Sequence, residues 1–374
     1  MGRCYKFMGL LDKFKKKSLY KEAFRLFHRG KYLDALKDYE KILLIDPLDP
    51  EAWSNKGNVF FKLERYDEAL KCYDKALKLD PKHKKALYNK GTTLGNLGKY
   101  HEALKYYNKA LKLDPNYIDV WDNKGIALKS LGRYQESLEC YNKALKLDPK
   151  NMGTWNNKGN VLSDLGRYQE ALECYNKALK LDPKNMGTWI NKSTTLLNLG
   201  RYQEALECCN KALEIDPEHP YVWYNKGNAL SDLGMCQEAL KCFDKALKLD
   251  PKYIAAWNNK GIALKCLERC QEALECFDKA LKLDPKYIAA WNNKGLALKY
   301  LRMCQEALEC YNKALEINPK YIAAWINKGI VFEKLERYQE ALKCFDKALE
   351  IDPEHENAKK AKEELLPSMQ NELP

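Results

Sequence analysis

The chain has 374 residues, of which 45% are apolar and 31% are charged, and its formal net charge is +12. This composition excludes a disordered or fibrous protein, because such chains are poor in apolar residues or dominated by Gly and Pro. No apolar run approaches the ~20 residues that a membrane-spanning helix needs, so we expect a soluble chain without a membrane partner.

Residues 1–15 are expected to form an N-terminal extension. Their short apolar patch is followed, rather than preceded, by the basic cluster Lys13, Lys15, Lys16 and Lys17. A cleavable export signal has the opposite order, with its positive charges ahead of the apolar stretch. The expected location is therefore cytoplasmic.

Residues 16–49 are predicted to form a degenerate helix pair that caps the array. The segment carries small, aromatic and turn residues at a spacing that recurs, more regularly, in residues 50–355: Gly30, Tyr32, Ala35, Tyr39 and Pro47. Leu19 stands where most later copies have Trp. Terminal copies of a repeat array are typically atypical in this way.

Residues 50–355 repeat with a period of 34 residues. Position 4 of each copy is Trp in eight of nine copies and Leu87 in the other, while Leu at 14, Glu at 19, Ala at 27 and Pro at 32 are invariant. Self-similarity at a fixed period is the strongest signal a sequence can carry about architecture. The nine repeats, numbered one to nine below, are 50–83, 84–117, 118–151, 152–185, 186–219, 220–253, 254–287, 288–321 and 322–355.

Each repeat is predicted to form two helices. Apolar residues at positions 4, 8, 11 and 14 have helical spacing, as do those at 20, 21, 24, 27 and 28. Position 15, Gly in repeats two to six, suits a left-handed helix stop, and Pro at 32 ends the second helix. Neither helix can bury its stripe alone, so neighbouring repeats must stack into an all-α solenoid.

The pattern of Trp at 4, Gly at 8, Leu or Phe at 11, Ala at 20, Tyr or Phe at 24, Ala at 27 and Pro at 32 resembles the tetratricopeptide repeat. The resemblance covers nearly the whole chain and implies a right-handed superhelix of antiparallel helix pairs. Lys at position 7 departs from the family pattern, but its alkyl stem can lie on apolar surface. Other departures are Ser193 at position 8 and, at position 15, Glu64, Glu268, Arg302 and Glu336.

Residues 356–374 are predicted to form a C-terminal capping helix and a tail. Ala358 and Leu365 continue the apolar pattern and should meet the preceding helix. Lys359 replaces the core Trp, as expected for a terminal helix whose far side faces water.

Position 6 is Asn in every full repeat, and we predict that these residues contact an extended peptide or partner segment. Positions 2, 6, 9 and 13 lie about 180° from the Trp stripe, on the face that the family resemblance places along the concave groove. A carboxamide both donates and accepts hydrogen bonds, which suits a peptide backbone. We call these residues the asparagine ladder: Asn55, Asn89, Asn123, Asn157, Asn191, Asn225, Asn259, Asn293 and Asn327.

A second interpretation of the ladder stays open. The repeats are nearly copies of one another, so a structural or solvent-exposed asparagine of a founding repeat would also recur in each copy. The same choice applies to the apolar groove anchors that we predict towards the C-terminal end. They could bind a partner or pack against neighbouring first helices, and they are Ile262, Leu296, Tyr300 and Ile330.

The carboxylate clamp of some tetratricopeptide proteins is not expected here. In family members that have this clamp, its pattern looks like Lys at position 5 followed by Lys or Arg at position 6 two repeats later. No full repeat has a cation at position 5 or 6. A chaperone-tail clamp is therefore not expected.

The net charge of +12 raises an alternative function, nucleic-acid binding, with RNA as the partner. The excess is spread along the repeats, where Lys at 7, 26 and 29 is interleaved with acidic residues. Such a diffuse positive surface is typical of a solvated face, so nucleic acid is the less favoured partner. Self-association remains possible.

The 14 cysteines are predicted to be free, small apolar packing residues. Eight occupy position 23 and three occupy position 17. Equivalent positions of adjacent repeats lie about 8–10 Å or more apart, whereas disulfide Cα atoms lie within ~7 Å. The five histidines are scattered, and no phosphate loop, metal motif or nucleophile–base pair is recognisable, so we expect no enzyme activity, no cofactor and no metal.

Overall fold

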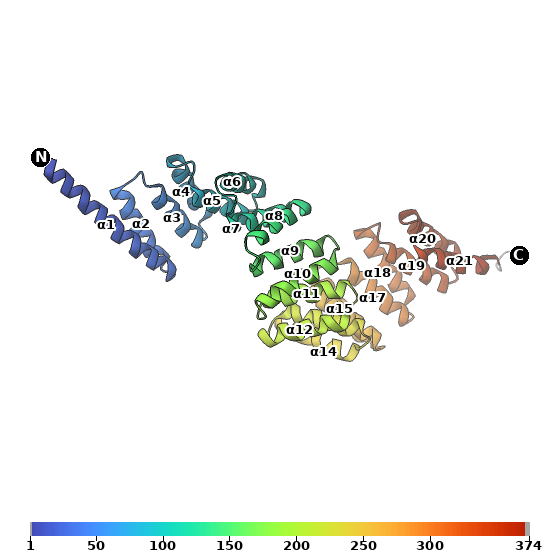
Figure 1. The fold of residues 1–374 in the computed structure, drawn as a ribbon. Coiled ribbons are helices and arrows are strands. Elements are labelled where there is room, and N and C mark those ends of the chain that lie inside the picture. Colours follow the sequence, from blue (N-terminus) through green and yellow to red (C-terminus); the bar gives the residue numbers. More distant parts are fainter. Residues whose placement is uncertain (1, 371–374) are drawn as a thin grey trace. The chain divides into compact units, whose positions relative to one another are not determined.

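The computed structural model describes residues 2–370, and within this range every regular element is an α-helix (Figure 1). The expected all-α solenoid of helix pairs is confirmed. The chain divides into two compact units, an N-terminal unit of residues 1–183 and a C-terminal unit of residues 184–374. No helix of the described residues is long and apolar enough to cross a membrane.

The N-terminal unit begins with a long helix, α1 (Gly2–His28), so residues 2–15 continue the first helix of the capping pair. Its partner is α2 (Tyr32–Ile45). Repeats one to four follow, each with a first and a second helix. These are α3 (Pro50–Lys62) and α4 (Tyr66–Leu79), α5 (Lys84–Asn96) and α6 (Tyr100–Leu113), α7 (Ile118–Ser130) and α8 (Tyr134–Leu147), and α9 (Met152–Asp164) and α10 (Tyr168–Leu181).

The C-terminal unit contains repeats five to nine and ends in α21 (Glu356–Gln370), which buries Ala358 and Leu365 completely. Its pairs are α11 (Met186–Asn198) and α12 (Tyr202–Ile215), α13 (Pro220–Asp232) and α14 (Cys236–Leu249), α15 (Ile254–Cys266) and α16 (Cys270–Leu283), α17 (Ile288–Tyr300) and α18 (Cys304–Ile317), and α19 (Ile322–Lys334) and α20 (Tyr338–Ile351).

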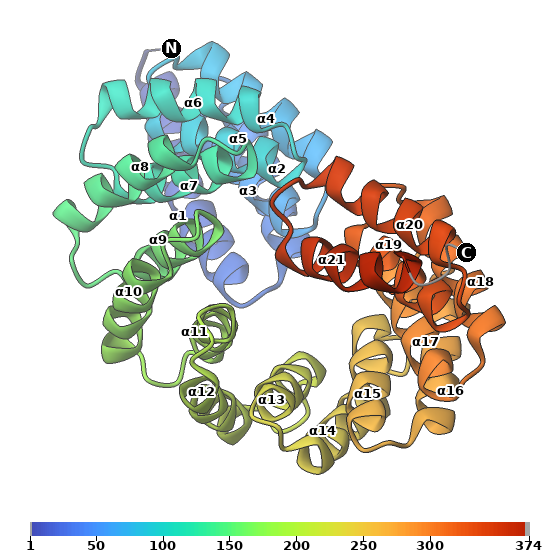
Figure 2. The same ribbon diagram turned by 90° about the vertical axis from the view of Figure 1, so that its right-hand side faces the viewer.

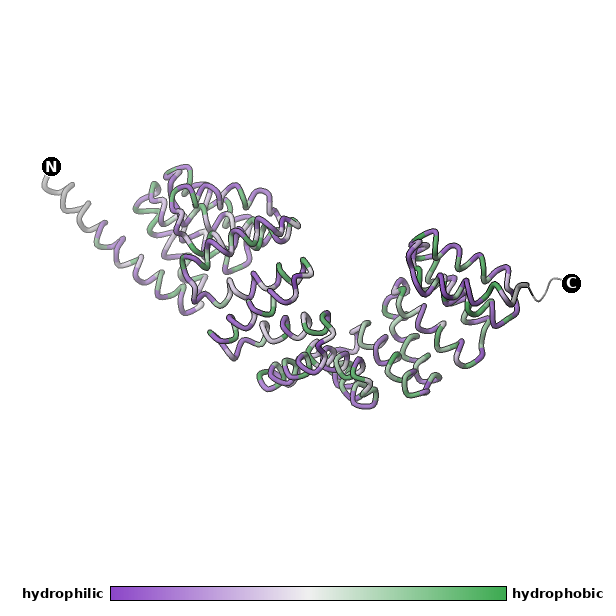
Figure 3. Tube along the Cα trace, turned by 45° about the vertical axis from the view of Figure 1, so that its right-hand side comes forward, coloured by the Kyte–Doolittle hydropathy of each residue, from purple (hydrophilic) through white to green (hydrophobic). Residues whose placement is uncertain are grey.

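The second helices of the repeats are amphipathic, whereas α15 and α17 carry apolar residues on both sides, and hydrophilic and hydrophobic residues alternate along the trace (Figure 3). The buried stripe is the one expected from the period: Ala at positions 20 and 27 is almost completely buried, as in Ala273 and Ala280. Because alanine adds little bulk, the two helices of a pair approach closely. Burial between stacked pairs, rather than any single helix, therefore holds each unit together.

The conserved tryptophans join the turns to the first helices. Their indole N–H groups donate to the carbonyl of the proline six residues earlier, as in Trp257 to Pro251 at 3.0 Å. Lys260 at position 7 and Lys279 at position 26 place their ammonium groups 5.4 and 4.5 Å from the centroid of the same ring. These cation–π contacts give the unusual Lys at position 7 a structural reason.

Glycine at position 8 lets an aromatic ring at position 24 pack directly on the first helix. A Cβ added to Gly261 would lie 2.5 Å from Phe277, closer than any real contact. Repeat five has a different pair, Ser193 at position 8 and Cys209 at position 24, and both are buried. The small thiol leaves room for the serine side chain, so these two substitutions compensate for each other.

The helix stop at position 15 has left-handed backbone geometry whether or not the residue is glycine. Glu268 has φ of 60° and Gly234 has φ of 77°. Left-handed geometry costs a residue with a Cβ about 1–2 kcal/mol, and glycine avoids this cost. Glycine also has more conformational freedom in the unfolded chain, which cancels up to ~1 kcal/mol of the advantage.

We therefore predict that Glu268→Gly raises the free energy of unfolding by about 0.5–1 kcal/mol. Glu268 is exposed, so the substitution removes no buried surface. Urea unfolding followed by circular dichroism measures the change, with Gly234→Ala as the reverse substitution, expected to lose stability. A loss of stability in Glu268→Gly would contradict this account of the turn.

The expectation that no cysteines pair is wrong at one place. Cys236 and Cys266 form a disulfide, with Cα atoms 6.5 Å apart. The bond joins position 17 of repeat six to position 13 of repeat seven. The distance argument made from the sequence considered only cysteines at equivalent positions of adjacent repeats. Eleven other cysteines of the described chain are free, and all of these except Cys304 are buried, as expected for small packing residues.

Candidate functional site

In each unit the first helices of successive repeats contact one another. In the C-terminal unit α11 contacts α13, α13 contacts α15, α15 contacts α17, and α17 contacts α19. Successive second helices make no comparable contact among the described helices. The unit therefore curves with its first helices inside, and Figure 2 shows α13 and α15 on the inner side of α14 and α16.

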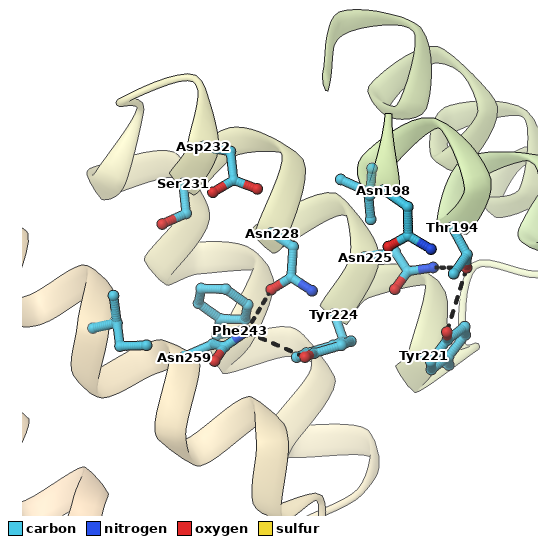
Figure 4. A pocket seen from close by; sticks show the side chains of 12 residues that line it. Thr194, Asn198, Tyr221, Tyr224, Asn225, Asn228, Ser231, Asp232, Phe243 and Asn259 are labelled. Atoms are coloured by element: carbon cyan, nitrogen blue, oxygen red, sulfur yellow. Dashed lines mark hydrogen bonds between the residues drawn. The ribbon is translucent and has the colours of Figure 1, made fainter. Parts of the chain in front are cut away.

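A cavity of about 430 Å³ opens on this inner side, across α11, α13 and α15 (Figure 4). Most of the residues that line it carry a polar group beside apolar surface, and two ladder residues, Asn225 and Asn259, belong to it. The remaining lining residues are Thr194, Leu197, Asn198, Tyr221, Tyr224, Asn228, Ser231, Asp232, Phe243 and Ile262.

Both ladder residues of the cavity donate hydrogen bonds to the preceding repeat. Asn225 Nδ2 lies 3.1 Å from Thr194 Oγ1, which in turn lies 3.3 Å from the Tyr221 hydroxyl. Asn259 Nδ2 lies 2.8 Å from Asn228 Oδ1 and 3.2 Å from the Tyr224 hydroxyl. These bonds orient the carboxamides and connect the three first helices across the cavity wall.

The same connection recurs along most of the ladder. Position 6 donates to position 5 or 9 of the repeat before it, from Asn89 to Asn58 Oδ1, Asn123 to the Tyr88 hydroxyl, Asn157 to Asp122 Oδ2, Asn293 to Asn258 Oδ1, and Asn327 to Asn292 Oδ1. Asn55 instead donates to Glu51 of its own helix at 3.4 Å. Asn191 lies partly buried on α11.

The ladder therefore has a structural task that the sequence analysis treated only as an alternative. Position 5 was examined there only for the cation of a carboxylate clamp. The hydrogen-bond acceptors that it carries, such as Tyr88, Asp122 and Asn292, were not considered. The signal available in the sequence was that position 5 or 9 carries an oxygen acceptor in most repeats. Recognising it requires knowing that these positions face the next repeat.

Burial changes the ionisation of two groups at the cavity. It raises the pKa of the Tyr224 hydroxyl, which stays neutral and able to donate. Partial desolvation likewise raises the pKa of the Asp232 carboxyl at the end of α13. The cavity thus presents hydroxyl and amide groups together with one exposed carboxyl group, that of Asp232.

The four predicted apolar anchors differ in exposure. Ile262 and Ile330 are partly buried against the hydrophobic core of the unit, so part of their surface is used in packing. Leu296 is half-buried, whereas Tyr300 is 66% exposed. Ile126, which occupies the same position 9 in repeat three and is 40% exposed, was missed by the sequence analysis.

The N-terminal unit has cavities of its own along its first helices. One of about 370 Å³ is lined by Asn123 and Ile126, with Tyr66 and Tyr107 beside them. Another of about 190 Å³ contains Asn89. Each of these cavities therefore includes a ladder residue. In the described part of the chain no group of three or more His, Cys, Asp or Glu side chains is placed to hold a metal ion.

Comparison with known families gives matches along almost the whole repeat array. The model described as "Cilia and flagella-associated protein 70 C-terminal domain" matches residues 16–220, which is more than half of the chain. Two tetratricopeptide repeat models match residues 220–253 and 322–355, and residues 252–320. No curated protein sequence matches the chain.

Solved structures with similar folds are tetratricopeptide repeat proteins or assemblies. A tetratricopeptide repeat protein from Parabacteroides merdae is 21% identical over 67% of this chain and 98% of its own, with a TM-score of 0.58. The Cut9–Hcn1 hetero-tetramer of APC/C is 18% identical over 96% and 85%, with a TM-score of 0.56. Yeast Tom70 is 19% identical over 96% and 89%, with a TM-score of 0.52. At these identities the likeness concerns the fold alone.

Proposed function

Because the chain belongs to the tetratricopeptide repeat family, whose fold generally mediates protein–protein interactions, we propose that it is a non-catalytic scaffold that holds an extended segment of a protein partner. The segment lies along the inner side of the first helices. The observation that carries the proposal is the polar cavity across α11, α13 and α15, which has the volume range of ligand sites and convergent amide and hydroxyl groups.

The proposal gives the asparagine ladder two tasks. In the cavity the amide nitrogens of Asn225 and Asn259 each donate to two acceptors of the preceding repeat. The part of a ladder carboxamide that such bonds do not use meets the backbone of the bound segment, whatever its side chains; Asn225, which is 2% exposed, serves only the first task. Because a residue already held by hydrogen bonds loses little further side-chain entropy on binding, such a ladder suits recognition of a peptide backbone.

The apolar anchors contribute the side-chain contacts of the same groove. Tyr300 is exposed and Leu296 is half-buried, so both have apolar surface to offer a partner. Affinity in this arrangement comes from many weak contacts along successive helices. We expect single substitutions of groove residues to have small effects and obstruction of the groove to have a large one.

The test obstructs the cavity without removing the ladder. Ser231 lies on its wall, at position 12 of repeat six, and Ser231→Trp would fill part of the cavity volume. The probe is a random peptide library displayed on phage and selected on the immobilised full-length chain. The matched control is Lys248→Trp, which places the same side chain on the exposed surface of the second helix α14.

We expect the native chain and Lys248→Trp to enrich peptides that Ser231→Trp no longer captures. Circular dichroism and melting temperature show whether both variants keep the fold. Equal capture by Ser231→Trp and the native chain, or failure of the native chain to enrich any peptide, would refute the proposed function.

A further inference from the structure

Two lysines lie near an exposed tyrosine at the ends of the first helices in the C-terminal unit, and a third follows on the next first helix. Lys265 and Lys299, both partly buried, occupy position 12 on α15 and α17, and Lys334 stands at position 13 on α19. The ring of Tyr300 lies between the first two, with its centroid 6.0 Å from Lys265 Nζ and 5.7 Å from Lys299 Nζ.

The N-terminal unit shows what these positions do when their charges are balanced. There Lys129, at position 12 of repeat three, forms an ion pair of 3.1 Å with Asp164, at position 13 of repeat four. In the C-terminal unit other residues stand at the position of Asp164. Tyr300 takes this position in the repeat after Lys265, and Lys334 takes it in the repeat after Lys299. The carboxylate that Asp164 supplies is therefore replaced once by a phenol and once by another cation.

Unlike Lys129, these lysines form no ion pair within 4.0 Å of a carboxylate in the described part of the chain. Burial lowers the pKa of the Lys265 and Lys299 ammonium groups, and for Lys299 the neighbouring Lys334 and Lys265 lower it further.

One carboxylate lies near the third lysine. Glu333 is adjacent to Lys334 in the chain; burial and the nearby Glu364 raise the pKa of its carboxyl group, whereas Lys334 lowers it. The partial negative charge at the C-terminal ends of the helices favours a nearby cation, yet it is present equally at Lys129, which has a carboxylate as well. Lys265 and Lys299 thus keep an unmet preference for an anion.

Aliphatic residues lie one helical turn away on the same helices. Ile262, Leu296 and Ile330 occupy position 9, three to four residues before the lysines, a spacing that places them on neighbouring parts of one helix face. Neighbouring first helices are about 8–10 Å apart, and an extended chain advances about 3.3 Å per residue. A segment that crosses these helices therefore passes one apolar and one cationic site for about every three residues.

We propose that the α15–α17–α19 surface binds an acidic, aliphatic segment of a partner protein, with Asp or Glu carboxylates against Lys265 and Lys299 and aliphatic side chains against Leu296 and its neighbours. This inference rests on the proposed function, since it specifies the chemistry of the segment that the groove holds. The lysine positions differ from those of the carboxylate clamp, which this chain lacks.

The test uses the phage-displayed random peptide library on the full-length chain and on Lys265→Gln/Lys299→Gln. The matched control is Lys248→Gln/Lys282→Gln, which removes the same charge from exposed lysines in the last turns of the second helices α14 and α16. We expect peptides enriched by the native chain and by the control to combine Asp or Glu with Leu, Ile or Val. Lys265→Gln/Lys299→Gln should still enrich peptides but without the preference for acidic residues.

Fluorescence anisotropy with the most enriched peptide, synthesised with a dye, then measures the contribution of charge. Lys265→Gln/Lys299→Gln should bind it about fivefold more weakly, the order expected for two partly exposed ion pairs. An all-glutamine version of the peptide should lose a similar factor on the native chain and nothing further on the variant.

Peptides selected without acidic enrichment, or with the same enrichment on Lys265→Gln/Lys299→Gln, would overturn this inference and leave the proposed function standing. Failure to select any peptide would overturn both. An oligothymidylate that binds as tightly as the peptide and competes with it would assign the lysines to nucleic acid instead, which also overturns the inference.

Discussion

Phe277→Ala is expected to lower the free energy of unfolding of the C-terminal unit by about 3–5 kcal/mol, the range measured for aromatic-to-alanine changes in protein cores. The Phe277 side chain is completely buried beneath Gly261. Because glycine has no side chain that could move into the space left behind, the cavity should persist. Loss of both buried area and packing contacts follows.

Urea unfolding monitored by circular dichroism measures this loss. Leu283→Ala, at the exposed end of the same helix α16, is the matched control, because this leucine is 40% exposed and its truncation should cost much less. Similar destabilisation by both substitutions would contradict the role assigned to the glycine–aromatic contact.

Cys209→Tyr is expected to destabilise the same unit by about 1–3 kcal/mol, the usual cost of overpacking a core. In all eight other repeats a Cβ at position 8 would lie less than 3 Å from the position 24 ring, as Gly227 shows against Phe243. Ser193 carries such a Cβ. A ring introduced at position 209 would therefore collide with it.

Ser193→Gly should rescue that loss in the double variant, although it is destabilising by itself. The single change introduces a helical glycine, which costs about 0.5–1 kcal/mol, and removes the serine hydroxyl that lies 3.3 Å from Asn225 Nδ2. We expect a favourable coupling energy of about 1–3 kcal/mol in the double-mutant cycle. Additive losses, measured by the same urea unfolding, would show that the two positions are independent.

The sequence was sufficient to predict the fold. Trp, Gly, Ala and Pro recur at fixed positions, and each has a local reason that does not depend on distant contacts. The helix bounds follow from that period, but the left-handed backbone of the non-glycine residues at position 15 is a finding of the structure, since the sequence showed them only as departures: Glu64, Glu268, Arg302 and Glu336. Near-identity of the repeats also means that one correct helix pair predicts all the others.

What the sequence could not give is which side chains meet across repeats. The ladder was placed on a helix face, but its bonds to Tyr224, Asn228 and Thr194 depend on the spacing between first helices. The same is true of the Cys236–Cys266 disulfide, whose members occupy different positions of the repeat. Likewise, Ser193 was noted as a departure, yet its compensation by Cys209 is visible only when the two helices are packed.

Whether a bound segment lies against the first helices can be measured directly by site-specific photocrosslinking. A benzophenone amino acid is placed at Tyr300, exposed on the inner helix α17, or at Leu283, exposed on the second helix α16. Each chain is irradiated with a peptide selected by the native protein, and adducts are mapped by mass spectrometry. The account predicts a strong adduct at position 300 and none at position 283; an adduct at position 283 without one at position 300 would contradict it.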